Sequence, residues 1–269
     1  MTALLSEQAD ALREIQAICG PLSVDVVVIG AVAYRVWVQD EHWATEDIDV
    51  AVALDLPDLP QLTDPLMGRG WRQDPRREHR WTSLKGARVD LIPVGGQARR
   101  DRRLRWPLGE TTMSLVGFDH VFNDAVQRDL APGLEGRVVP LVVLALLKMV
   151  SYLDQPWGRR KDLEDVASIM HAYEEAGERR FGDEVIDAAV DYTEAGAFLL
   201  GRDLSRLCAE PDERDAVERF LRVISETGSD AVVVPGWPSY EGQNLRAERF
   251  ARQSGALVRG WGRSGYRRS

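Results

Sequence analysis

The chain has 269 residues, of which 44% are hydrophobic and 29% are charged, and its formal net charge is −9. This composition is typical of a globular protein with one large domain or two smaller ones. The negative charge argues against a protein that coats nucleic acids, and no apolar run reaches the roughly 20 residues of a membrane-spanning helix. The two cysteines, Cys19 and Cys208, do not make a disulfide framework, so we expect a cytoplasmic protein without a membrane partner.

The first half of the chain alternates between helical and strand patterns. Apolar residues at helical spacing predict helices over residues 5–19 and 31–39, and a shorter helix is expected between Pro60 and Met67. Runs of β-branched residues predict strands that form a mixed sheet with flanking helices, an α+β (mixed α/β) fold. The expected strands cover residues 24–29, 47–54, 71–73, 80–84 and 88–93.

From Phe118 onward the pattern becomes mainly helical, apart from a short strand at Val138 and Val139. The sequence therefore predicts an N-terminal sheet domain followed by a C-terminal helical bundle. The expected helices cover residues 140–153, 159–171, 183–202 and 211–226, and the third is either continuous or broken around Gly196. The expected domains are residues 1–135 and 136–235, followed by a basic, flexible tail over 236–269.

The tail is rich in arginine and has two open interpretations. It is either a disordered arm that binds RNA or a poorly ordered terminus without a function. Its arginines are Arg246, Arg249, Arg252, Arg259, Arg263, Arg267 and Arg268.

Three aspartates lie at the start of apolar runs. Asp47 and Asp49 are two residues apart, so on a strand their side chains face the same side. If the strand that carries Asp90 lies beside theirs, three carboxylates converge, and such a cluster needs a cation. Carboxylates suit Mg²⁺, a hard ion that leaves coordination places open for phosphate oxygens. The alternative is that the Asp-x-Asp pattern arose by chance at a strand end.

A glycine follows the first buried strand. Gly30 and Ala31 stand between this strand and a predicted helix. Glycine lets a ligand approach the backbone, and a helix N-terminus offers free N–H groups to phosphate. Most glycines in this position only make a turn, so this signal is weak by itself.

Taken together, the order of these features resembles the nucleotidyltransferase superfamily related to DNA polymerase beta, and in particular the AbiEii/AbiGii type of bacterial proteins. These are nucleotidyltransferase-like toxins of type IV toxin–antitoxin systems. The resemblance covers roughly residues 20 to 205. It rests on Ile29–Ala33, Ala44–Asp49, Val89–Gly96, Arg105–Pro107, Arg159–Asp165 and Ala195–Asp203.

The resemblance implies a polymerase beta-like sheet and transfer of a nucleoside monophosphate from an NTP to a hydroxyl. Asp47, Asp49 and Asp90 would hold two Mg²⁺ ions, with Mn²⁺ as a substitute, and Gly30, Ala31 and Thr45 would contact the nucleotide. The acceptor implied is RNA, the 3′ end of a tRNA, and the implied protein partner is a cognate antitoxin; DNA is not expected. Two positions depart from the family: Ala31 stands where many relatives have Ser or Gly, and Trp43 where many have Arg.

A later helical segment carries further candidate residues. Lys148 lies in an apolar helix, where it either reaches water along its own stem or contacts an anion. The resemblance assigns it to the triphosphate and expects Asp162 to position it or the substrate. It also implies that Arg160 and Lys161 contact the nucleotide. Lys161 could instead form a surface pair with Asp165, four residues away.

Arginines also cluster on both sides of Asp90. They either hold triphosphate or RNA backbone, or they belong to solvated loops. Three rival functions remain open: an antibiotic-modifying nucleotidyltransferase, a non-catalytic binding protein on the same fold, and a magnesium-dependent hydrolase. The clustered arginines are Arg69, Arg72, Arg76, Arg77, Arg80, Arg99, Arg100, Arg102, Arg103 and Arg105.

Overall fold

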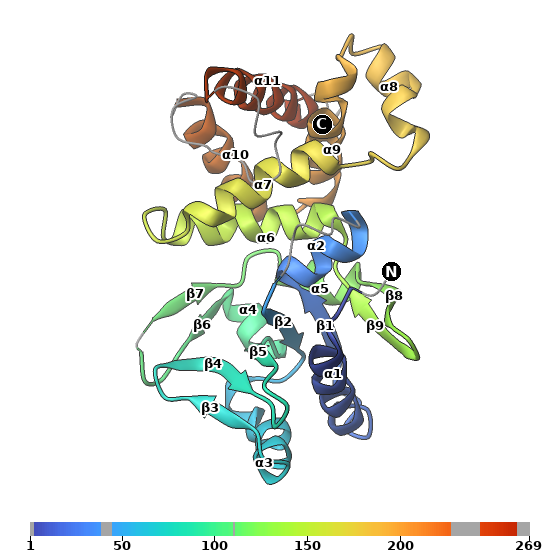
Figure 1. The fold of residues 1–269 in the computed structure, drawn as a ribbon. Coiled ribbons are helices and arrows are strands. Elements are labelled where there is room, and N and C mark those ends of the chain that lie inside the picture. Colours follow the sequence, from blue (N-terminus) through green and yellow to red (C-terminus); the bar gives the residue numbers. More distant parts are fainter. Residues whose placement is uncertain (1–2, 39–44, 110, 227–242, 263–269) are drawn as a thin grey trace. The chain divides into compact units, whose positions relative to one another are not determined.

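The computed structural model describes residues 3–38, 45–109, 111–226 and 243–262 (Figure 1). Trp43 and part of the predicted tail lie outside these residues. The chain forms two compact units, Met1–Leu144 and Ala145–Ser269. The first unit contains the sheet and the second is helical, so the predicted mixed α+β class is confirmed.

A seven-stranded mixed sheet forms the centre of the first unit. Strands β2 and β5 are parallel to each other, as are β1 and β9, whereas the other neighbouring pairs are antiparallel. The central strands are buried because they consist of β-branched and other apolar residues such as Val27, Val28 and Ile48. In spatial order the strands are β3 (Arg72–Asp74), β4 (Arg77–Thr82), β5 (Arg88–Pro93), β2 (Asp47–Val52), β1 (Val26–Ile29), β9 (Leu134–Val138) and β8 (Val126–Ala131).

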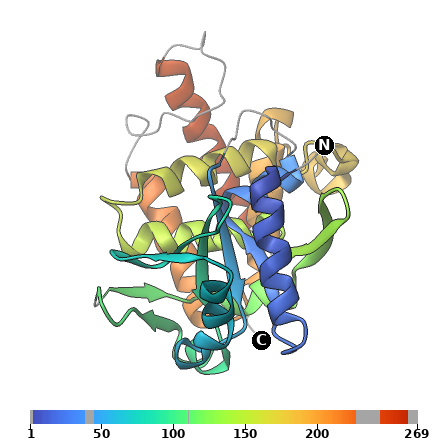
Figure 2. The ribbon, with the colours of Figure 1, turned by 60° about the horizontal axis from the view of Figure 1, so that its bottom comes forward.

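Helices and a small second sheet accompany this central sheet. Figure 2 shows helix α1 (Ser6–Cys19) alongside the strands. Its contacts span most of the sheet, since Gln16 donates to the carbonyl of Glu135 on β9 at 2.9 Å and Glu14 accepts from Trp71, directly before β3, at 2.9 Å. The remaining elements are α2 (Gly30–Val38), η1 (Leu56–Asp58), α3 (Pro60–Gly68), α4 (Gly96–Asp101), β6 (Arg103–Arg105), β7 (Thr112–Ser114) and α5 (Phe118–Asn123).

The first unit extends beyond the expected boundary after residue 135. Residues 126–138, expected to lie in a mainly helical region, form the β8–β9 hairpin, which turns at Gly133 with φ of 66°. Strand β9 pairs with β1 in parallel, placing Val28 beside Val138. The sheet therefore keeps this segment in the first unit, and the expected boundary falls inside β9.

The second unit consists of helices. Among the described residues, no helix combines the length and the apolar character that crossing a membrane requires. The elements are α6 (Leu141–Asp154), which begins in the first unit, α7 (Arg160–Ala172), η2 (Glu178–Phe181), α8 (Asp183–Ile186), α9 (Tyr192–Leu207), α10 (Pro211–Glu226) and α11 (Gln243–Gly262).

The segment 183–202 is divided into two helices, but the division lies between Ile186 and Tyr192, and the expected break around Gly196 is wrong because Gly196 lies inside α9. Helix α8 ends at Ile186, and Ala189 adopts a positive φ of 50°, which an α-helix does not allow. Helix α9 then begins afresh, because the side chain of Asp191 accepts a hydrogen bond from the backbone N–H of Thr193 at 2.9 Å.

The prediction of a flexible tail is also wrong for residues 243–262, which form helix α11. The arginines of this segment obscure an apolar stripe at helical spacing, and Phe250, Leu257 and Trp261 on this stripe are buried. Helices α9 and α11 approach each other closely at two glycines. An added Cβ at Gly260 would lie 2.1 Å from the carbonyl oxygen of Phe198.

We expect Gly260→Ala to destabilise the second unit by roughly 1–3 kcal/mol, because the new methyl group forces the two helices apart. Gly201→Ala should act in the same direction, since its Cβ would lie 2.2 Å from the carbonyl oxygen of Leu257. Denaturant unfolding followed by circular dichroism measures the loss.

The matched control is Gly255→Ala on the same helix, where an added Cβ meets nothing within 4 Å. This exposed substitution should leave stability unchanged or raise it by about 0.5–1 kcal/mol, since alanine favours a helix over glycine. Equal effects of Gly260→Ala and Gly255→Ala would contradict close helix packing at Gly260.

Candidate functional site

The three predicted aspartates lie on one face of the central sheet. Parallel pairing of β2 and β5 places Asp49 directly beside Asp90, and residues paired in this way point to the same side. Asp47 lies two residues before Asp49 on the same strand and shares that side. Asp90 is buried, whereas Asp47 and Asp49 are half-buried. The strand register therefore brings three carboxylates into one region.

Gly30 is required because of the position of Asp49. Antiparallel pairing places Ile29 opposite Asp49, and helix α2 begins at Gly30 directly after this strand. Gly30 has a φ of 68°, and an added Cβ would lie 1.9 Å from the Oδ2 atom of Asp49. Only glycine accommodates both the backbone conformation and the carboxylate. The start of α2, including Ala31, is thus adjacent to the aspartate face.

Thr45 stabilises the start of strand β2. Its hydroxyl donates to the carbonyl of Asp47 at 3.0 Å and lies 3.3 Å from the backbone N–H of the same residue. The backbone carbonyl of Thr45 accepts from the amide of Gln8 at 3.0 Å. The residue predicted to contact nucleotide therefore fixes the chain immediately before the first aspartate.

Two arginines contact the aspartates. Arg80 lies opposite Asp90 in the antiparallel β4–β5 pair. Its guanidinium donates to both oxygens of Asp90 at 2.8 and 2.9 Å, and to Oδ2 of Asp47 at 2.7 Å. Arg88, which pairs with Asp47 in the β2–β5 ladder, lies 2.8 Å from the other oxygen of Asp47 and also contacts Glu46.

Arg80 remains positively charged in this environment. Hydrogen bonding to Asp90 raises its pKa above the usual value, and the negative charges of Asp47 and Asp49 act in the same direction against the effect of burial. Only 15% of the Arg80 side chain is exposed. The carboxylates and the guanidinium therefore form a mutually stabilising, partly buried cluster.

The donor atoms of the cluster suit a hard divalent cation such as Mg²⁺, because carboxylate oxygens are its preferred protein ligands. In this arrangement, however, both oxygens of Asp47 and of Asp90 contact arginine. Across the described part of the chain, no three His, Cys, Asp or Glu side chains form a group that could hold a metal ion. Binding of a cation to these oxygens therefore requires the arginine contacts to open.

Gly95, the first of the two glycines after β5, has a packing role. An added Cβ at Gly95 would lie 2.2 Å from the backbone nitrogen of Asp55. The carboxylate of Asp55 accepts from the backbone N–H groups of Gln97 and Ala98 at 3.1 and 2.9 Å at the start of α4. Gly95 therefore lets the chain after Asp90 pack against Asp55.

In the second unit, Lys148 lies between two buried carboxylates. Its amino group is 2.9 Å from Oδ1 of Asp162 and 2.6 Å from Oδ2 of Asp165, while Ser151 donates to Asp162 at 2.7 Å. Burial favours a lower pKa for Lys148, but the two carboxylates outweigh it and hold the pKa above the usual value. Lys148 therefore remains charged within an otherwise apolar helix.

The two other basic residues that were predicted to contact the nucleotide are exposed, in contrast to Lys148. Arg160 and Lys161 are the first two residues of helix α7. Asp165, considered above as a surface partner of Lys161, is buried and bonds Lys148 instead. The sequence indicated that Asp165 lies on the same side as Asp162, because residues three apart share one face of a helix.

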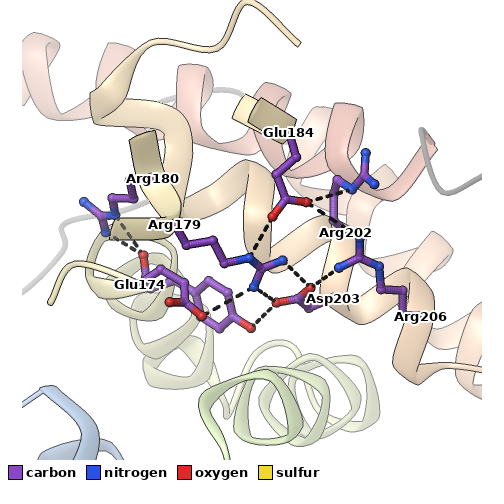
Figure 3. Close-up of polar contacts among 8 residues, drawn as sticks. Glu174, Arg179, Arg180, Glu184, Arg202, Asp203 and Arg206 are labelled. Carbon is purple, nitrogen blue, oxygen red and sulfur yellow. Dashed lines mark hydrogen bonds and ion pairs between the residues drawn. The ribbon is translucent and has the colours of Figure 1, made fainter. Parts of the chain in front are cut away.

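Asp203, the last residue of the segment Ala195–Asp203 discussed above, belongs to an ion network within the second unit (Figure 3). Arg179 makes a two-pronged contact with Asp203, with one nitrogen 2.7 Å from Oδ1, and it also donates to Glu184 at 2.7 Å. The hydroxyl of Tyr173 donates to Asp203 at 2.7 Å, and Arg206 does so at 3.0 Å. These contacts attach η2 and α8 to α9.

Neither a protein-family model nor a curated protein sequence matches the chain. One similar solved structure is the antibiotic-resistance factor ANT(2″)-Ia, with a TM-score of 0.38 and 10% identity over 67% of this chain and 88% of the other. Another is an antigenic nucleotidyltransferase-like protein from Paracoccidioides brasiliensis, with a TM-score of 0.42 and 16% identity over 80% and 94%. Both similarities are too weak to assign a function, which therefore depends on the residues of this chain.

We expect Gly30→Ala to destabilise the first unit by roughly 1–3 kcal/mol, because a left-handed backbone strains alanine and its methyl group would displace Asp49. Thermal unfolding monitored by circular dichroism measures the effect. Gly86→Ala is the control, since Gly86 also has a positive φ of 87° but an added Cβ there meets nothing within 4 Å. Gly30→Ala should be the more destabilising of the two; an equal loss would contradict the contact with Asp49.

Asp203→Asn should destabilise the second unit by roughly 2–3 kcal/mol at pH 7, because it removes the charge that Arg179 contacts. Burial favours a raised pKa for Asp203, but hydrogen bonds from Arg179 and Tyr173 outweigh it and lower the pKa. The stabilisation is therefore present above the ordinary aspartate pKa, and it is lost as the pH falls through the lower pKa of the folded state.

Denaturant unfolding of Asp203→Asn and wild type at pH 7 and at pH values below 4 tests this linkage. The difference in unfolding free energy should narrow in acid, where the wild-type carboxylate becomes protonated. Asp215→Asn is a matched control, because Asp215 is exposed and lies 3.6 Å from Arg219. A constant difference for Asp203→Asn at all pH values would contradict the assigned charge effect.

Proposed function

We propose that this protein is a nucleotidyltransferase that moves a nucleoside monophosphate from an NTP to an acceptor hydroxyl, with Mg²⁺ held by Asp47, Asp49 and Asp90. One observation carries the proposal. Asp49 lies over Gly30 at the start of α2 and beside Asp90 on the neighbouring strand. Carboxylates for a cation and backbone N–H groups for phosphate therefore occur together.

The proposed reaction forms one phosphorus–oxygen bond and breaks another. The acceptor oxygen attacks the α-phosphorus of the NTP, and the bond to the β-phosphate breaks, so that pyrophosphate leaves with the electron pair. Asp90 accepts the proton of the acceptor hydroxyl. Bound Mg²⁺ would supply charge stabilisation to the phosphates. Gly30 and Ala31 would offer backbone N–H groups, as expected at a helix start.

Lys148 supplies a permanent positive charge in this proposal. Asp162 and Asp165 fix its amino group and keep it protonated. A fixed cation stabilises the negative charge that develops on leaving pyrophosphate. We assign this role to Lys148, with Arg160 and Lys161 as additional nucleotide contacts.

We propose RNA as the acceptor, specifically the 3′ end of tRNA, and a toxin role opposed by an antitoxin. The support within the structure is a set of exposed arginines in the same unit as the aspartates, on or beside β3, β4, α4 and β6. Such arginines contact phosphate backbones without regard to sequence. They are Arg72, Arg76, Arg77, Arg100, Arg103 and Arg105.

The test is incubation of purified protein with Mg²⁺, total tRNA and each α-labelled NTP in turn. We expect label on RNA from one or more NTPs, with release of pyrophosphate rather than inorganic phosphate. Asp49→Asn should lower the labelling rate at least about 100-fold, because it removes a carboxylate that the reaction needs.

Asp64→Asn is the matched control for charge loss, because Asp64 is exposed on α3; it should label RNA at the wild-type rate. Transfer to a small hydroxylated compound instead of RNA would overturn the tRNA assignment and keep nucleotidyl transfer. Release of inorganic phosphate alone would indicate a hydrolase. NTP binding without any transfer would indicate a binding protein.

A further inference from the structure

Arg80 contacts two of the three aspartates in the cluster, Asp47 and Asp90. It lies on β4, whereas Asp90 is on β5 and Asp47 is on β2, so one guanidinium bridges carboxylates from two other strands. The antiparallel register fixes the Arg80–Asp90 pairing through the backbone. The contact is thus a consequence of sheet pairing and does not depend on a freely placed surface side chain.

The contacts of Arg80 use the same oxygen atoms that a divalent cation would need. Arg80 bonds both oxygens of Asp90 and one oxygen of Asp47, and Arg88 contacts the remaining oxygen of Asp47. A guanidinium and a divalent cation on one carboxylate repel each other strongly at such distances in a partly buried site. Simultaneous occupancy is therefore unfavourable.

We propose that Arg80 is the built-in counter-cation of the aspartate cluster, and that a metal-bound nucleoside triphosphate displaces it. Released from Asp47 and Asp90, the planar guanidinium becomes available to the triphosphate, whose charged oxygens accept the parallel N–H groups of arginine in pairs. The inference rests on the proposed function, which places metal and nucleotide at these aspartates. Arg80 is here a positioning residue that sets the affinity for the metal.

Measurement of Mn²⁺ binding without nucleotide, by electron paramagnetic resonance, tests the competition. Arg80→Gln should bind Mn²⁺ at least roughly tenfold more tightly than wild type, because removal of a nearby positive charge favours the ion. The matched control is Lys85→Gln in the turn that follows the same strand, whose side chain is exposed. It loses the same charge and should keep the wild-type affinity.

Unchanged or weaker Mn²⁺ binding by Arg80→Gln would overturn the inference, provided that its circular dichroism spectrum shows a folded protein. So would equal tightening in Lys85→Gln, which would reveal a general charge effect. This result is separable from nucleotidyl transfer. Tighter binding by Arg80→Gln together with no transfer by wild type would support Arg80 as counter-cation and refute the proposed function.

Wild-type protein provides a second measurement if Arg80→Gln does not fold. The Nε–H group of Arg80 is 2.8 Å from Asp90 and should give a distinct arginine resonance in ¹⁵N nuclear magnetic resonance spectra. Its assignment comes from its disappearance in Arg80→Lys. Addition of Mg²⁺ with a non-hydrolysable NTP should shift this resonance. A resonance that stays unchanged when the nucleotide is bound would overturn displacement.

Discussion

The repulsion among three aspartates on one face of the sheet is the constraint on which the arrangement of the first unit depends. The ladder that brings the carboxylates together also supplies the cations: Arg80 is the paired residue of Asp90, and Arg88 is that of Asp47. A shift of one residue between β4 and β5 would turn Arg80 to the opposite face. Asp90 would then be buried without this partner, so the charge balance favours one register.

Gly30 connects this charged face to the backbone. The β1–β2 pairing fixes Asp49 opposite Ile29, and the chain must turn into α2 at the next residue. A side chain at this turn would occupy the position of the Asp49 carboxylate, whereas glycine leaves it free. The helix start and the carboxylate are therefore placed by the same two strands, and neither can move alone. This coupling makes the region where β1, β2 and α2 meet a better candidate site than either feature alone.

Local patterns predicted the strands around the aspartates, because β-branched runs and alternation depend on neighbouring residues only. Contacts that depend on pairing were harder to predict. From the sequence, Arg80 was one member of a basic cluster. Its pairing with Asp90 could have been predicted from the turn near Gly86, because Arg80 and Asp90 lie at equal distances along the chain on the two sides of that turn. Helix α11 was missed because its apolar stripe, including Phe250 and Leu257, is diluted by arginines. A helical repeat of apolar residues is hard to recognise in the sequence when long charged side chains, whose stems also pack against apolar surface, stand between them.

The two ion clusters of this protein compensate charge in the same way but differ in what lies beside them. Arg179 contacts both Asp203 and Glu184 and thereby attaches η2 and α8 to α9. Arg80 likewise contacts both Asp47 and Asp90, and Arg88 gives Asp47 a second partner. Only at the aspartate face, however, does a neighbouring carboxylate, that of Asp49, lie against Gly30 at the start of α2. Because a helix start offers backbone N–H groups to phosphate, the aspartate face is the better place for a cation-dependent reaction on a nucleotide.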